Sequence, residues 1–299
     1  MSDHVRHHFI PQFIIKNFCS SHDGFLSYFD KTTGKLGLKN KEDIFVTPNL
    51  YKDESDQYGD PQRIEKDLSK FESVMAPIIK RLLAGDTIEI TEDEVDSLKL
   101  FFAIMAFRSK RTYLHFLNMD PDSKDFFGQY QKDGDIGAFW KRNLGLLTQH
   151  RLYRDVIADE RIDFPIKIFM FRDTQALLGM YPIIVERRGQ RDFLLGDTYP
   201  TVQTGEGPDG FPTPMYSFYP LSPNRMLVLA ANGVQWAGDD VRLFDKSVLV
   251  RPFPKAEDRD TIILKVKKIY EPTVRELNEL AADTALEGYA MQNPMRCLQ

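Results

Sequence analysis

The stretch LKLFFAIMAF, residues 98–107, constrains the fold more than any other part of this sequence. Thr91 and Glu94 precede it at the spacing of a capping box, so a helix is expected to begin there. A surface helix is apolar on one face, whereas residues 98–107 are apolar on nearly every side. The sequence therefore predicts a central helix, over about 95–117, that other elements surround. The apolar run is far shorter than the ~20 residues that a membrane span needs.

The periodicity of the chain changes near residue 160. Before it, apolar residues at helical spacing predict further helices at 61–83, 120–132 and 136–158, together with a short helix after Pro11 and a β-hairpin at 24–39. From Phe164, short β-rich runs separated by Gly, Pro and Asp predict a mostly antiparallel sheet over 164–252. A closing helix is expected over 272–292, with small residues, Gly288 among them, on one face.

We therefore expect an α+β fold in which a helical N-terminal half packs against a mostly antiparallel sheet. The predicted regions are 1–160, mainly helical with an N-terminal hairpin, and 161–299, antiparallel β with a C-terminal helix. One integrated domain is the alternative, because the hairpin and the last helix could cross the boundary.

Composition limits the classes of function. The net charge of -5 argues against a general nucleic-acid coat but leaves room for local basic patches. Cys19 and Cys297 lie at opposite ends and make neither a disulfide framework nor a CxxC zinc pattern, which favours a reducing, cytoplasmic compartment. The apolar segment near the start is short and broken by Pro11 and Gln12, unlike a signal peptide. No membrane association is expected, and no phosphate-binding loop, dinucleotide fingerprint or HExxH motif occurs.

The opening motif HHFIPQF, residues 7–13, holds the first candidate site residues. His7 and His8 point in different directions, so one of them could act as a general base or metal ligand near neutral pH. Alternatively, their imidazoles hold the N-terminal segment by hydrogen bonds. Gln12 is expected to orient whichever histidine is functional.

Arg108 and Arg111 are the candidate phosphate-binding or anion-binding residues. In a single helix they would share a face with Phe101, Ile104 and His115. A buried guanidinium needs a carboxylate or phosphate partner. Two structural alternatives are open: the arginines cap the end of the helix, or they pair with Glu65 or Glu72, of which Glu72 is the expected supporting carboxylate.

Asp197 is the third candidate catalytic residue, because it follows an apolar strand and precedes a tight turn. A carboxylate displayed there can hold a ligand or a metal, although aspartate is also a common turn residue. Ser222 and Asn224 are expected only to form a turn between strands.

Several stretches together resemble the DUF4238 family of uncharacterised bacterial and phage-associated proteins. They are HHFIPQFIIKNF (7–18), NLYKDE (49–54), IEKDLSKFES (64–73), FFAIMAFRSKRT (101–112), FLLGDTYP (193–200), YPLSPNRMLVL (219–229) and VRELNELAADTA (274–285). The family pattern has Ser-Asp-Asn-Pro where this chain has residues 196–200, GDTYP. The resemblance implies no established activity, and it places His7 and His8 in a motif of the fold itself.

Two functions follow from these residues. The first is a phosphodiester-cleaving, nuclease-like enzyme in bacterial or phage defence, with His7 or His8 and Asp197 as catalytic groups, Arg108 and Arg111 as a phosphate clamp, and Mg²⁺ or Mn²⁺ as the metal it could use. The second is a non-catalytic protein that binds a nucleotide, nucleic acid or other anion at the same residues. A homodimer is compatible with both.

Overall fold

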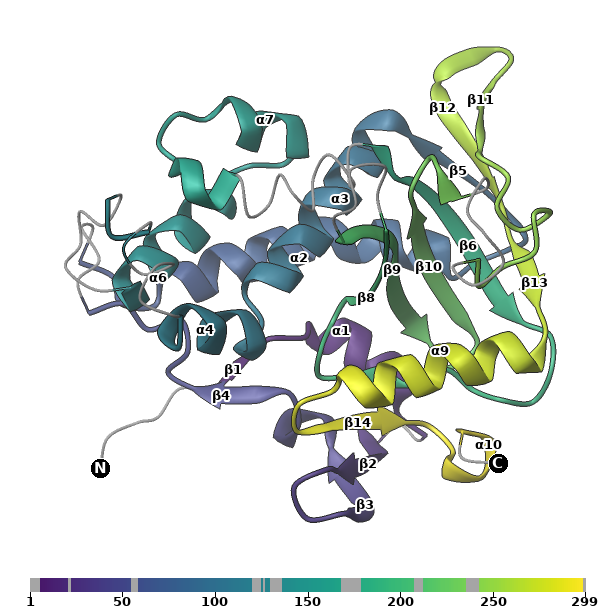
Figure 1. Cartoon of the computed structure of the whole chain (residues 1–299), viewed down its shortest axis with the longest axis horizontal. Helices are drawn as coiled ribbons and strands as arrows, with labels where there is room; N and C mark the ends of the chain where they lie inside the picture. The colour runs from purple at the N-terminus through teal and green to yellow at the C-terminus, as the bar shows by residue number, and fades with distance from the viewer. Residues whose placement is uncertain are drawn as a thin grey trace.

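The computed structural model describes residues 6–20, 23–54, 59–119, 125, 127–129, 136–167, 179–206, 212–234 and 242–297. The fold is mixed α+β with several mostly antiparallel sheets, which confirms the predicted class. Helices gather on one side of the molecule and the largest sheet lies on the other (Figure 1). Within the described residues, no helix has the length and apolar character needed to cross a membrane.

The helical side is built around one buried helix. Its members are α2 (Arg63–Leu82), α3 (Glu92–Phe107), α4 (Lys110–Leu117), α6 (Ile136–Leu147) and α7 (Tyr153–Ala158). α3 contacts the other four, and its residues from Leu98 to Met105 are all buried. Thr91 and Glu94 form the predicted capping box at its start. The central helix is therefore confirmed, and neighbouring elements cover its apolar residues on every side.

Two of the predicted helices are in fact broken. The helix expected over 95–117 ends at Phe107, and α4 begins after Ser109, whose side chain accepts a hydrogen bond from the amide of Thr112 as an N-cap. The helix expected over 136–158 divides into α6 and α7. The helix expected at 120–132 lies almost wholly outside the described residues.

The largest sheet has five strands in the order β13-β6-β10-β9-β8. They are β6 (Tyr181–Arg187), β8 (Thr201–Glu206), β9 (Pro212–Ser222), β10 (Arg225–Ala230) and β13 (Lys267–Ile269). All pairs are antiparallel except β13 with β6. The Ser222 hydroxyl bonds to the Asn224 side chain at 2.7 Å and accepts from the amide of Arg225, so these residues form the predicted turn. The sheet does not begin at Phe164, because residues 164–167 are helical, and most of 247–253 is not strand.

A four-stranded sheet joins the two ends of the sequence. Its order is β3-β2-β14-β7, with β2 (Phe25–Asp30), β3 (Lys35–Asn40), β7 (Leu195–Gly196) and β14 (Gly288–Met291). β2 and β3 are the predicted hairpin. The helix predicted over 272–292 is wrong beyond α9 (Glu271–Thr284), because residues 288–291 pair with β2 and β7 instead. Gly288 consequently lies in a strand and not on a helix face.

The remaining elements are short. A three-stranded sheet has the order β11-β12-β5, and a two-stranded sheet joins β1 to β4. Their bounds, with those of the small helices, are β1 (Arg6–His8), β4 (Val46–Pro48), β5 (Thr87–Thr91), β11 (Phe253–Lys255), β12 (Asp258–Lys265), α1 (Gln12–Ile15), η1 (Lys16–Phe18), η2 (Lys41–Asp43) and α10 (Pro294–Cys297). The short helix predicted after Pro11 is thus confirmed.

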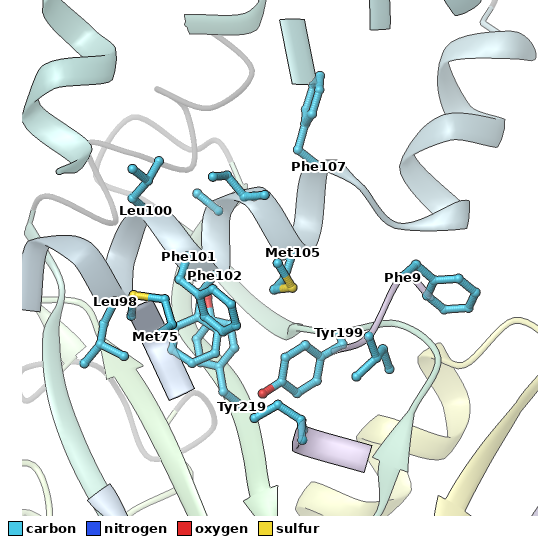
Figure 2. Packing of buried hydrophobic residues seen from close by; sticks show 14 of the residues in the cluster. Phe9, Met75, Leu98, Leu100, Phe101, Phe102, Met105, Phe107, Tyr199 and Tyr219 are labelled. Carbon is cyan, nitrogen blue, oxygen red and sulfur yellow. The ribbon is translucent and has the colours of Figure 1, made fainter. Parts of the chain in front are cut away.

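The main hydrophobic core lies between α3 and the sheets. Phe102 of α3 packs on Tyr219 of β9, with 3.6 Å between ring centroids, and Tyr199 lies beside both (Figure 2). Phe107 points away from this group toward Trp140 of α6. The same core thus contains residues from both sides of position 160. The division into two regions stays a prediction.

Candidate functional site

The opening motif is held by a two-stranded sheet. β1 pairs antiparallel with β4, so that His7 lies opposite Thr47 and His8 opposite Val46. Successive residues of a strand face opposite ways. His7 is fully buried and His8 is half-buried, so the two side chains lie in different environments, as expected for neighbours in the sequence.

Both ring nitrogens of His7 are engaged. The amide of Tyr51 donates to Nδ1 at 2.8 Å, and Nε2 lies 3.2 Å from the Gln62 side-chain oxygen. The ring also stacks on Tyr51 at 5.1 Å between centroids. Because Nδ1 accepts, the proton belongs on Nε2, which donates to Gln62. Burial lowers the pKa of His7, so the neutral ring holds the N-terminal segment in place.

His8 has a less complete set of partners. Nδ1 lies 3.4 Å from the Gln12 side-chain nitrogen, which places Gln12 where it was expected to orient a histidine. Nε2 is buried near the main chain of Lys41 and, among the described residues, has no hydrogen bond of good geometry. Burial lowers the pKa of His8, against the effect of the main chain of Lys41, and the positive charges of Arg6 and Arg108 lower it further. His8 is therefore neutral near pH 7, with one ring nitrogen available.

Arg108 ties the opening motif to the helical core. Its side chain is 1% exposed; Nη1 donates to the Glu72 carboxylate at 2.7 Å and Nε to the carbonyl of Phe9 at 3.1 Å. The Tyr51 hydroxyl donates to the main-chain carbonyl of Arg108. Of the alternatives left open for Arg108, the structure shows the ion pair with Glu72. The third nitrogen, Nη2, is buried and makes no hydrogen bond to the described residues.

Arg111 does not accompany Arg108. The shared helix face was inferred for one continuous helix, and the break at Ser109 removes it. Arg111 and His115 are exposed on α4, whereas Arg108 is buried at the end of α3. The two arginines therefore do not form one buried clamp.

Glu65, the other carboxylate considered as a partner of the arginines, also lies near Arg108. Burial raises the pKa of Glu65 to about 7, and the negative charge of Glu72 adds to this while Arg108 opposes it. Its Oε2 is buried without a hydrogen-bond partner in the described part of the chain. Glu65 and Glu72 each follow a buried residue of α2, Ile64 and Phe71, by one position. That placement at the edge of an apolar stripe was the signal that could have revealed their partial burial.

Asp197 serves a turn elsewhere in the fold. It is 6% exposed, and its carboxylate accepts from the amides of Leu286 at 2.7 Å, Glu287 at 2.5 Å and Gly288 at 3.1 Å. Burial raises the pKa of Asp197, against the effect of these three hydrogen bonds. The carboxylate thereby fixes the connection from α9 to β14, and most of its acceptor capacity is used.

The structure thus assembles part of the predicted site. Gln12 lies beside His8, Glu72 pairs with Arg108, and the charge of Arg108 acts on both His8 and Glu65. His7 and Asp197 are engaged with other partners. We define the acid–base cluster as His8, Glu65, Glu72 and Arg108. Three of its buried polar atoms, His8 Nε2, Glu65 Oε2 and Arg108 Nη2, lack hydrogen-bond partners among the described residues. No group of three or more His, Cys, Asp or Glu side chains in the described ranges is arranged to hold a metal ion.

Comparisons with known proteins identify the family of this chain. No curated protein and no solved structure matches the chain. The model of one family, described as "Protein of unknown function (DUF4238)", matches residues 6–294, which include the opening motif, α2, α3 and β14. The chain therefore belongs to the DUF4238 family.

Proposed function

We propose that this protein is a phosphodiester-cleaving, nuclease-like enzyme whose catalytic groups are His8 and Glu65, with Arg108 as the phosphate contact. One observation carries the proposal: a neutral imidazole, a carboxyl group and a guanidinium each leave one buried polar atom unpaired in the same cluster. Buried polar atoms without a partner are uncommon in native proteins, and a catalytic role is one of the explanations for them.

The protonation states fit acid–base catalysis near neutral pH. A general base and a general acid are needed together, and efficient ones have pKa values near the working pH. His8 is neutral and can accept a proton at Nε2 when Nδ1–H donates to the side-chain oxygen of Gln12, an orientation that a flip of the amide provides. Glu65, with its pKa raised to about 7, still holds a proton in much of the population at pH 7.

The proposed reaction is a hydrolysis. His8 takes a proton from water as the water oxygen bonds to phosphorus, and Glu65 gives its proton to the oxygen that leaves. The P–O bond to the leaving group breaks, giving a phosphate monoester and an alcohol. Arg108 Nη2 donates to a non-bridging phosphate oxygen, while Glu72 holds the other side of the guanidinium in place. His7 and Asp197 act as structural supports in this scheme. A cytoplasmic defence role against phage is part of the same proposal.

The test is cleavage of labelled single-stranded RNA, single-stranded DNA and duplex DNA, each with EDTA, Mg²⁺ or Mn²⁺. His8→Gln and Glu65→Gln keep the approximate size of each side chain and remove the proton transfer. His115→Gln, on the exposed face of α4, is the control. We expect cleavage to fall about 10²-fold or more in the first two variants and to stay unchanged in the control. The alkaline limb of the pH profile, near pH 7, should disappear in Glu65→Gln.

Equal cleavage by all four proteins, or no cleavage of any substrate, would reject the catalytic proposal. The second candidate is then a non-catalytic protein that binds a small anion at the same cluster. The burial of all three unpaired atoms favours this candidate, since a small ligand can be enclosed where a polymer has less access. In that case His8→Gln should weaken phosphate binding measured by calorimetry.

A further inference from the structure

A second candidate site lies at the other end of α3. A pocket of about 530 Å³ opens between the first turns of α3, the start of β6 and the hairpin of β11 and β12. Pockets that enclose small organic ligands fall in this range of volumes. Lys99 of α3 lies about two and a half helical turns before Arg108, so this pocket is separate from the acid–base cluster.

Three cations among the described residues line the pocket: Lys99, Arg251 and Arg154, of which Arg154 is already paired with Asp93 at 2.6 Å. Lys99 is 9% exposed although it carries an ammonium group, and it belongs to the buried stretch of α3. Arg251, from the segment just before β11, lines the same pocket and is exposed. Burial lowers the pKa of Lys99, and the positive charge of Arg251 lowers it further, against the effect of Asp96. An anion that enters the pocket would be attracted by both Lys99 and Arg251.

The rest of the lining offers hydrogen-bond acceptors and apolar surface to a ligand. Glu92 and Asp96 extend from the first turns of α3 and can accept hydrogen bonds from hydroxyl groups. Tyr181, Pro252 and Phe253, the last 62% exposed, offer apolar and aromatic surface on the side of the pocket formed by β6 and β11. Flat rings stack on such surfaces.

We propose that this pocket binds a mononucleotide. Its phosphate would lie between Lys99 and Arg251, its ribose hydroxyls would donate to Glu92 and Asp96, and its base would rest on Phe253 and Tyr181. A phosphate has three terminal oxygens and can meet two separate cations, and carboxylates are common partners of ribose hydroxyls. This proposal is independent of the proposed phosphodiester cleavage, because the two sites share no residue.

The experiment is isothermal titration calorimetry of the whole chain with adenosine 5′-monophosphate, adenosine and inorganic phosphate. We expect the monophosphate to bind more tightly than either fragment. Lys99→Met and Arg251→Gln should each weaken its binding by about tenfold or more, the usual effect of losing a hydrogen bond to a charged group. Arg259→Gln, an exposed arginine of β12 that does not line the pocket, should bind as the parent does.

His8→Gln should also bind the monophosphate normally, which distinguishes this pocket from the acid–base cluster. Arg251 is exposed, so its variant keeps the fold even if the change at the buried Lys99 does not. The proposal is overturned if the parent protein does not bind the monophosphate at millimolar concentration. It is equally overturned if adenosine binds as tightly as the monophosphate, or if binding survives the substitution of Arg251.

Discussion

Replacing Asp197 with asparagine tests whether this carboxylate is a structural clamp. In the structure Oδ2 accepts from two amides, those of Glu287 and Gly288, and Oδ1 accepts from Leu286. An asparagine side chain has one oxygen, which would remain with the two donors, and its NH₂ group would then face the amide of Leu286. One N–H therefore loses its acceptor, and the other two bond to a neutral oxygen instead of a charged one.

The magnitude follows from these three bonds. A hydrogen bond to a charged group contributes about 1.5–3 kcal/mol, and one between neutral groups about 1 kcal/mol. The lost hydrogen-bond energy is partly offset, because the variant no longer buries a charge. The cost of burying that charge is what raises the pKa of Asp197. We expect Asp197→Asn to lower the free energy of unfolding by about 2 kcal/mol. Asp197→Ala, which removes every acceptor, should lower it by about 4 kcal/mol.

The assay is urea denaturation followed by circular dichroism, with thermal melting as a second measurement. A loss of about 2 kcal/mol corresponds to a fall in Tm of about 3 °C in a chain of this size. Asp283→Asn is the matched control, because Asp283 is exposed near the end of α9 and its substitution should change stability by less than about 0.5 kcal/mol. If Asp197→Asn were as stable as this control and had lost activity, Asp197 would be catalytic and the clamp interpretation would be refuted.

Three further predictions concern other positions. Gly288→Ala should prevent stable folding, measured by expression and circular dichroism, because a Cβ would lie 2.3 Å from the carbonyl oxygen of Phe29. Arg108→Met should lower the free energy of unfolding by about 3 kcal/mol in urea denaturation, since it leaves the Glu72 carboxylate without its ion pair. Glu65→Gln should have little effect at pH 4 and stabilise the protein at pH 8. The pKa of Glu65 in the folded protein, about 7, is above its unfolded value of about 4.5. The free energy of unfolding of the parent therefore falls by up to about 3 kcal/mol as the pH rises from about 4.5 to 7. Equal stability of the two proteins at pH 8 would contradict that shift.

Local patterns predicted the elements that depend on local chemistry. The capping box at Thr91 and the run of apolar residues after it identified α3, and the turn residues around Gly34 identified the β2–β3 hairpin. The end of α3 was missed, because a single serine within a helical pattern is a weak signal. A tertiary contact accompanies the break: the Arg108 carbonyl accepts a hydrogen bond from the Tyr51 hydroxyl, far away in the sequence.

The errors near residue 288 and in the site have the same origin. Residues 285–292 follow a helix without a strong breaker other than Gly288, and only pairing with β2 and β7 makes them a strand. Likewise, the motif located His8 and the helix pattern located Arg108, but the role of Asp197 depends on amides of a turn about 90 positions later. Such long-range pairings cannot be inferred from periodicity in one sequence.

The position of β14 has a consequence for how the chain folds during synthesis. Of the described elements, only α10 is made after β14, yet β14 is the strand that separates β2 from β7. While the ribosome is still translating α9, β2 and its hairpin partner present an open edge, and such edges pair readily with other chains. A nascent chain of this protein therefore depends on β14 to close a sheet that the β2–β3 hairpin began, and chaperones that cover unpaired strands would protect it until β14 is made.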